Sequence, residues 1–176
     1  MNIGLTERSR SNLFEGNKAP DFSLYNENNT LIKLSQLLKI APVMVVFYPE
    51  DFTWICTKQL CAYQEAKETF KKFGILLVGI SPNTIGDHIK FKDAYKFDFH
   101  LLSDPQNDVY KNYGLTSLFK LGGNSRANFI INCDGTILYR HVEATRATFR
   151  KVDELVAVLN KLNEKCELKS TLAKAA

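Results

Sequence analysis

Two runs of consecutive apolar residues, many of them β-branched, mark buried strands at 43–48 (VMVVFY) and 75–81 (ILLVGIS). Between the two runs, Tyr63, Ala66, Phe70 and Phe73 recur at helical spacing, and Gly74 follows them as a helix terminator. The pattern predicts one helix from 56 to 73 between two strands. Strands joined in this way lie parallel in one sheet, so we expect a βαβ unit.

In the rest of the chain, predicted strands also alternate with predicted helices. Strands are expected at 100–104 and in a hairpin over 126–142 that turns at Asp134 and Gly135, with two shorter ones around an Asn-rich turn within 21–34. Helices are expected at 84–97, at 105–114 between a proline and a glycine, and at 151–162, where Val152, Leu155, Val156, Leu159 and Leu162 share one face. This order predicts an α/β fold with a mixed central sheet flanked by helices.

Length and composition narrow the class of protein. The chain has 176 residues, 45% of them apolar and 24% charged, which suits one globular domain. We expect a lead-in at 1–13, a domain at 14–163 and a polar tail at 164–176. The first residues lack a signal-peptide core, and no apolar run approaches the roughly 20 residues of a membrane span. A cytoplasmic protein without membrane contact is therefore expected.

Charge and cysteine content exclude two further classes of protein, nucleic-acid-binding proteins and secreted proteins held together by disulfides. The net charge is +4, but the lysines are spread along the chain and form no basic stripe with aromatic residues, so we expect no nucleic-acid partner. Four cysteines are too few for a disulfide-stapled secreted scaffold. We therefore expect these thiols to be reduced.

Two of the cysteines occupy a position with chemical consequences. Cys56 follows a strand and a loop and lies where the predicted helix begins, so free backbone N–H groups and the helix dipole can stabilise its thiolate. Thr53 can cap the helix there. Cys61 is five residues further on, and Cα atoms at that spacing in a helix lie roughly 8 to 9 Å apart. A disulfide needs about 7 Å or less, so pairing requires the first turn to unwind.

The pair alone leaves several interpretations open. Two cysteines on one helix are most often small core residues. A metal site has little support, because His88, His100 and His141 are scattered and no metal-ligand spacing is present. A thioredoxin-type oxidoreductase would need C-x-x-C, which is absent.

The segment YPEDFTWICTKQLC (48–61) resembles the active-site segment of peroxiredoxins, whose pattern is Pro-x-x-x-Thr/Ser-x-x-Cys. Pro49, Thr53 and Cys56 match that pattern position for position. The C-x4-C spacing is similar to that of the bacterioferritin-comigratory, or Q-type, branch. The resemblance continues through GNKAPDFSL, FKKFGILLVGISPN, LLSDPQNDVYKNYG and SRANFIINCDGTI, so it covers roughly residues 14–162.

The resemblance implies a thioredoxin-like fold and a thiol peroxidase that needs no metal, haem or flavin. Cys56 would be the peroxidatic cysteine and Cys61 the resolving one. Thr53 and Arg126 would hold the peroxide oxygens, and Pro49 would shield the sulfur from water. The implied substrates are hydrogen peroxide and organic hydroperoxides, and the implied reductant is thioredoxin or a similar dithiol protein. The branch implies a monomer or a weak homodimer.

The chain departs from the Q-type pattern beside the reactive sulfur, where Trp54 and Ile55 replace the usual Pro-Gly pair. These side chains either pack outward against a neighbour or shape a pocket that favours organic hydroperoxides. Cys133 and Cys166 are expected to be bystanders, with Cys166 the rival candidate for the resolving role. Two other functions stay open: a redox sensor built on the Cys56–Cys61 pair, and a non-catalytic holdase that uses exposed apolar surface such as Trp54.

Overall fold

The computed structural model describes residues 13–115 and 124–165. Almost all of the predicted lead-in and tail, and Cys166, lie outside these residues. Within them, one mixed sheet has the strand order β2-β1-β5-β4-β3-β6-β7. The strands are β1 (Ser23–Asn26), β2 (Leu31–Lys33), β3 (Val43–Phe47), β4 (Leu76–Ser81), β5 (His100–Ser103), β6 (Ala127–Ile131) and β7 (Ile137–Val142). The helices are α1 (Leu34–Leu37), α2 (Trp54–Glu65), α3 (Lys67–Lys72), α4 (Ile85–Tyr95), α5 (Asp108–Asn112) and α6 (Val152–Glu164).

The inner strand β3, next to the central strand β4, is buried along its whole length. It pairs in parallel with β4, as the predicted βαβ unit requires, and antiparallel with β6. In the second pairing Phe47 lies opposite Ala127. The last residue of β3 and the first residue of β6 therefore meet at the same end of the sheet.

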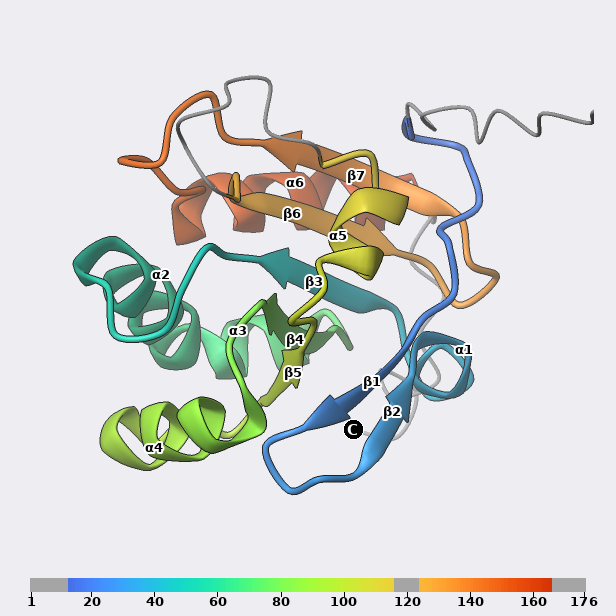
Figure 1. The fold of residues 1–176 in the computed structure, drawn as a ribbon. Helices are drawn as coiled ribbons and strands as arrows, with labels where there is room; N and C mark the ends of the chain where they lie inside the picture. The colour runs from blue at the N-terminus through green and yellow to red at the C-terminus, as the bar shows by residue number, and fades with distance from the viewer. Residues whose placement is uncertain (1–12, 116–123, 166–176) are drawn as a thin grey trace, which may run out of the picture.

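Helices cover both faces of the sheet (Figure 1). Because side chains alternate along a strand, Val43, Val45 and Phe47 join the core that includes residues of α1 and α5. Met44 and Val46 point to the other face, where α2, α3, α4 and α6 contribute to a second core. This arrangement confirms the predicted mixed sheet flanked by helices.

The helix predicted over 56–73 is in fact two helices, which corrects the sequence interpretation. It begins earlier, at Trp54, and breaks at Ala66, whose ψ of 5° departs from helical geometry. Thr69 N–H then bonds the Ala66 carbonyl at 2.9 Å, an i to i+3 contact. The apolar spacing conceals the break because Tyr63 and Phe70, on either side of it, belong to the same core.

The expected helix at 105–114 is also shorter, because Pro105 does not begin it. The helix α5 begins at Asp108, and the Asp104 carboxylate accepts hydrogen bonds from the backbone N–H groups of Asp108 and Tyr110. Acceptors at a helix N-terminus satisfy N–H groups that have no partner within the helix. The predicted hairpin turn is confirmed, with Gly135 at φ +84°, a conformation that glycine adopts without strain. None of the helices in the described part of the chain is long and apolar enough to cross a membrane.

Candidate active site

Cys56 lies in the first turn of α2 and is fully buried. The first backbone bond of this turn runs from Thr57 N–H to the Thr53 carbonyl, at 2.9 Å. The N–H groups of the turn itself have no acceptor within the helix, and the positive end of the helix dipole lies here. This position favours a negative charge on the sulfur.

Arg126 approaches the same sulfur from the other half of the chain. It directly precedes β6, and the pairing of Phe47 with Ala127 brings it to the end of β3 from which the loop to Cys56 departs. Its Nη1 donates to Cys56 Sγ at 2.9 Å and to Gln59 Oε1 at 3.2 Å. Its Nη2 donates to the Arg146 carbonyl at 3.5 Å. The structure thus brings together two of the predicted site residues.

The charge on Arg126 faces the sulfur without competition from a carboxylate. The side chain is only 2% exposed, and no ion pair joins it to an acidic residue within the described ranges. A buried guanidinium is costly unless an anion or hydrogen-bond acceptors compensate it. Gln59 and the Arg146 carbonyl are neutral acceptors, so a Cys56 thiolate would be the anionic partner.

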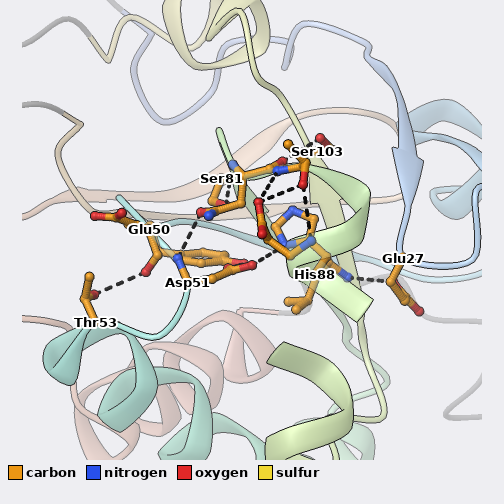
Figure 2. Close-up of polar contacts among 12 residues, drawn as sticks. Glu27, Glu50, Asp51, Thr53, Ser81, His88 and Ser103 are labelled. Atoms are coloured by element: carbon orange, nitrogen blue, oxygen red, sulfur yellow. Dashed lines mark hydrogen bonds and ion pairs between the residues drawn. The ribbon is translucent and has the colours of Figure 1, made fainter. Parts of the chain in front are cut away.

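Thr53 occupies the expected position but makes a different bond from the one predicted. It is the N-cap residue of α2 by its backbone, yet its side chain makes no capping bond to the helix. Instead its Oγ1 donates to the Glu50 carbonyl at 3.2 Å (Figure 2). This bond closes the loop that joins β3 to α2. It leaves the hydroxyl oxygen free to accept a hydrogen bond, since one O–H donor accompanies two lone pairs.

Pro49 is buried at the start of this loop and borders a small polar pocket. The pocket has a volume of about 400 Å³. It also touches Arg146, whose carbonyl accepts from the guanidinium of Arg126. The remaining lining residues are Glu50, Pro82, Asn83, Thr84, Asp87 and Asn124. A small polar ligand in this pocket would lie beside the loop that carries Thr53.

Cys61 lies on the same helix as Cys56 but in a different environment. It is half-buried, and both cysteines are free thiols. Burial raises the pKa of the Cys61 thiol, and the nearby carboxylate of Glu65 raises it further. Cys61 is therefore a protonated thiol at neutral pH. Its resolving role, like the catalytic roles of the other residues, stays a prediction.

The side chain of Trp54 projects into solvent. It is 77% exposed, and Ile55 is half-buried. This placement agrees with the outward-packing interpretation and gives no support to a pocket walled by Trp54.

Sequence reasoning missed Gln59 and a buried polar network beneath the loop. Gln59 lies three residues after Cys56 on α2, and that spacing alone would have placed it on the face of Cys56. The network consists of Tyr48, Asp51 and His88, and no local pattern in the sequence links the last two. Among the described residues no group of three or more His, Cys, Asp or Glu side chains could hold a metal ion.

Residues 16–140 match the AhpC/TSA family. The chain is 38% identical over 125 residues to the chloroplastic peroxiredoxin Q of Oryza sativa subsp. japonica, which covers 71% of this chain and 57% of that protein. It is 35% identical over 127 residues to a peroxiredoxin bcp of Coxiella burnetii, covering 69% of this chain and 83% of that one. The match thus spans little more than half the length of the plant relatives.

Solved structures give the same result for the fold. Peroxidoxin BcpB from Mycobacterium tuberculosis superposes with a TM-score of 0.74 at 31% identity, over 84% of this chain and 97% of that one. The reduced 2-Cys peroxiredoxin of Plasmodium vivax gives a TM-score of 0.78 at 25% identity, over 88% and 84% of the two chains. The fold is therefore the thioredoxin-like fold of these proteins.

Proposed function

Because the chain belongs to the AhpC/TSA family, and within it to the bacterioferritin-comigratory or peroxiredoxin Q branch, we propose that it is a thiol-dependent peroxidase. Its substrates are hydrogen peroxide and organic hydroperoxides, and Cys56 is the residue that attacks them. No nucleic acid or membrane takes part. The protein acts in the cytoplasm as a monomer or weak homodimer.

The observation that carries this proposal is the 2.9 Å contact between Arg126 Nη1 and Cys56 Sγ. Both groups are buried, and Gln59, the other side chain bonded to that nitrogen, is uncharged. A cation and a helix N-terminus on one sulfur lower the cost of the thiolate, which is the nucleophilic form. A core cysteine needs neither of these features.

The first step oxidises Cys56. Its thiolate attacks one peroxide oxygen, an S–O bond forms, and the O–O bond breaks. The departing oxygen takes a proton from solvent and leaves as water or an alcohol, so the product on the protein is a sulfenic acid. Arg126, Thr53 and the free N–H groups of α2 stabilise the charge that moves onto the departing oxygen. Pro49 keeps bulk water from the sulfur.

The second step forms a disulfide. The Cys61 thiol condenses with the sulfenic acid, an S–S bond forms and water is released. Both residues belong to α2, so its first turn must unwind before the sulfur atoms can meet. Thioredoxin or a similar dithiol protein then reduces the disulfide by thiol exchange, and its own dithiol becomes oxidised.

Stopped-flow fluorescence tests the first step. Trp54 is the only tryptophan and lies two residues from Cys56, so its emission should report oxidation and unwinding. We expect fast phases whose rates rise with the concentration of hydrogen peroxide or cumene hydroperoxide. Cys56→Ser should abolish these phases, and Cys133→Ser should retain them. A wild-type reaction no faster than that of a free thiol would disprove the proposal.

Mass spectrometry of the oxidised protein tests the second step. We expect a Cys56–Cys61 disulfide that Cys61→Ser abolishes and Cys166→Ser leaves intact. In Cys61→Ser the first fluorescence phase should persist, because Cys56 is unchanged, while steady-state turnover with thioredoxin should be lost. A disulfide that disappears only in Cys166→Ser would reassign the resolving residue.

A further inference from the structure

A buried polar network lies beneath the loop that carries Pro49 and Thr53. Tyr48 donates its hydroxyl proton to Asp51 Oδ1 at 2.8 Å, and Asp51 Oδ2 lies 2.8 Å from His88 Nδ1 (Figure 2). All three side chains are buried. A carboxylate only accepts hydrogen bonds, so His88 Nδ1 is the donor. The other ring nitrogen of His88 has no hydrogen-bond partner in the described part of the chain. The bond to Asp51 is therefore the one hydrogen bond that fixes the His88 ring among the described residues.

The backbone of the same loop is also held by the segment that directly follows the C-terminal end of β4. Asp51 N–H donates to Asn83 Oδ1 at 2.9 Å. Asn83 is itself held by Ser81, whose Oγ donates to Asn83 Oδ1 at 3.0 Å, and by Ser103, whose Oγ donates to the Asn83 carbonyl at 2.6 Å (Figure 2). Both the side chain and the backbone of Asp51 are thus fixed from outside the loop.

The loop needs such support because it holds a strained residue. Phe52 has a φ of +59°, a left-handed conformation that is an outlier for a bulky side chain. Its ring packs against Phe91 of α4, with ring centroids 4.9 Å apart. Strained backbone persists only where neighbouring groups over-determine it. Here α4 supplies the contact on Phe52 and, through His88, the contact on Asp51.

We propose that Asp51 and His88 are positioning residues, which hold the loop 49–53, and with it Pro49 and Thr53, beside the first turn of α2 that carries Cys56. This inference rests on the proposed peroxidase function. Asp51 is adjacent in the chain to the residue that holds the Thr53 side chain. Thr53 Oγ1 donates to the carbonyl of Glu50, which directly precedes Asp51. Burial, and then the negative charge of Asp51, raise the pKa of Tyr48, so its phenol stays a protonated donor to the carboxylate.

A second buried carboxylate, Glu27, provides a matched control: it also bonds a histidine and reaches α4 through Lys92, but it makes no hydrogen bond to residues 49–53 among the described residues. Glu27 accepts from Lys92 Nζ and from the Leu101 N–H at 3.0 Å, and its Oε1 lies 3.1 Å from His100 Nδ1. Burial raises its pKa, but the bonds from His100 and Lys92 outweigh burial and lower it to about 2, from an ordinary value of 4.5.

The lowered pKa gives Glu27 a defined effect on stability. A group with a depressed folded-state pKa stabilises the fold above its unfolded pKa, and this contribution is lost as the pH falls toward the folded value. Glu27 therefore stabilises the protein above about pH 4.5 and loses this effect toward pH 2. Glu27→Gln should lower the denaturation midpoint at neutral pH without touching the site.

The test compares two reactions of Cys56 in each variant. Peroxide oxidation, followed by Trp54 fluorescence, needs an oriented peroxide. Alkylation by iodoacetamide, counted on the Cys56 peptide by mass spectrometry, needs an accessible thiolate but no oriented peroxide. In His88→Leu, which cannot donate to Asp51, we expect the peroxide rate to fall about 30-fold, since small displacements of positioning groups have effects up to about 100-fold. Alkylation should change less than about threefold.

A conservative variant and the control separate positioning from packing. His88→Asn retains an N–H donor near the place of Nδ1 and should recover most of the peroxide rate lost in His88→Leu. Glu27→Gln should keep both rates at the wild-type values. If His88→Leu does not fold, Asp51→Ala, which removes the acceptor of the ring bond, should still lose about tenfold in the peroxide rate alone.

Three outcomes would overturn the inference: a folded His88→Leu with the wild-type peroxide rate, an equal fall of both rates, or an equal fall of the peroxide rate in Glu27→Gln. A wild-type protein that reacts with peroxide no faster than a free thiol would instead overturn the proposed function, and the inference with it.

Discussion

Cys56 and Cys61 lie on one helix, yet their surroundings have opposite electrostatic effects. Cys56 is fully buried at the helix N-terminus with the guanidinium of Arg126 at 2.9 Å. Cys61 is half-buried further along, where burial and the carboxylate of Glu65 raise its pKa. The charged side chain that acts on the sulfur thus has opposite sign at the two sites. Burial alone disfavours a thiolate, so the cation must compensate it at Cys56.

The largest expected effect comes from removing that cation. Arg126→Met should lower the rate of Cys56 oxidation by peroxide about 100- to 1,000-fold, because it removes both the thiolate's partner and a donor to the departing oxygen. Stopped-flow fluorescence measures the rate. Lys58→Met is the control, since Lys58 is an exposed cation on the same helix and solvent screens its charge. An equal effect of the two substitutions would mean that the close contact of Arg126 has no special role.

A smaller effect should follow from giving Arg126 a competing anion. Gln59 Oε1 lies 3.2 Å from the same nitrogen that contacts the sulfur. Gln59→Glu places a carboxylate there, which competes with the sulfur for the guanidinium and should slow alkylation of Cys56 at neutral pH about tenfold. Gln59→Met, which removes the bond without adding charge, should have a weaker effect. If the glutamate variant reacted as fast as wild type, the charge argument for Cys56 would fail.

The smallest effect concerns Cys61. Glu65→Gln removes the second cause of its raised pKa but leaves burial in place, so Cys61 alkylation at pH 8 should rise about two- to threefold. Glu68→Gln, on α3, is the control for a lost negative charge. Because burial and the carboxylate of Glu65 raise the pKa of Cys61, its alkylation should rise steadily as the pH increases from 7 to 9.

Equal alkylation rates of Cys56 and Cys61 at pH 7 would contradict the comparison. Peptide-resolved mass spectrometry distinguishes them in one experiment, so no cysteine has to be removed. A Cys61 rate that levels off below pH 9 would show that this thiol does not experience the environment seen in the structure.

Sequence reasoning succeeded where local chemistry decides the structure. The apolar runs predicted β3 and β4, and the spacing of Cys56 and Cys61 placed both on one helix. It failed where several local hydrogen-bonding arrangements compete and the surrounding fold selects one of them. Nothing in the local sequence shows that α2 ends at Glu65, or that the Thr53 hydroxyl bonds the Glu50 carbonyl and not the helix.

The partners of the site residues are the hardest to predict. Arg126 is 70 residues from Cys56, and only a family resemblance singled it out. Asp51 and His88 are 37 residues apart, and neither was predicted to be functional. Gln59 differs, because helical spacing relative to Cys56 could have identified it. Pairs that meet across the sheet depend on strand order, which residue spacing does not encode.

The pairing of β3 with β6 means that the short motif around Cys56 is incomplete by itself. Its positive partner arrives only when a strand from the second half of the chain lines up beside β3. A truncated chain that ended before Arg126 and β6 would keep every residue from Pro49 to Cys56. It would lack the guanidinium that donates to the sulfur. Motif searches would score such a fragment as intact, although its cysteine would be an ordinary thiol.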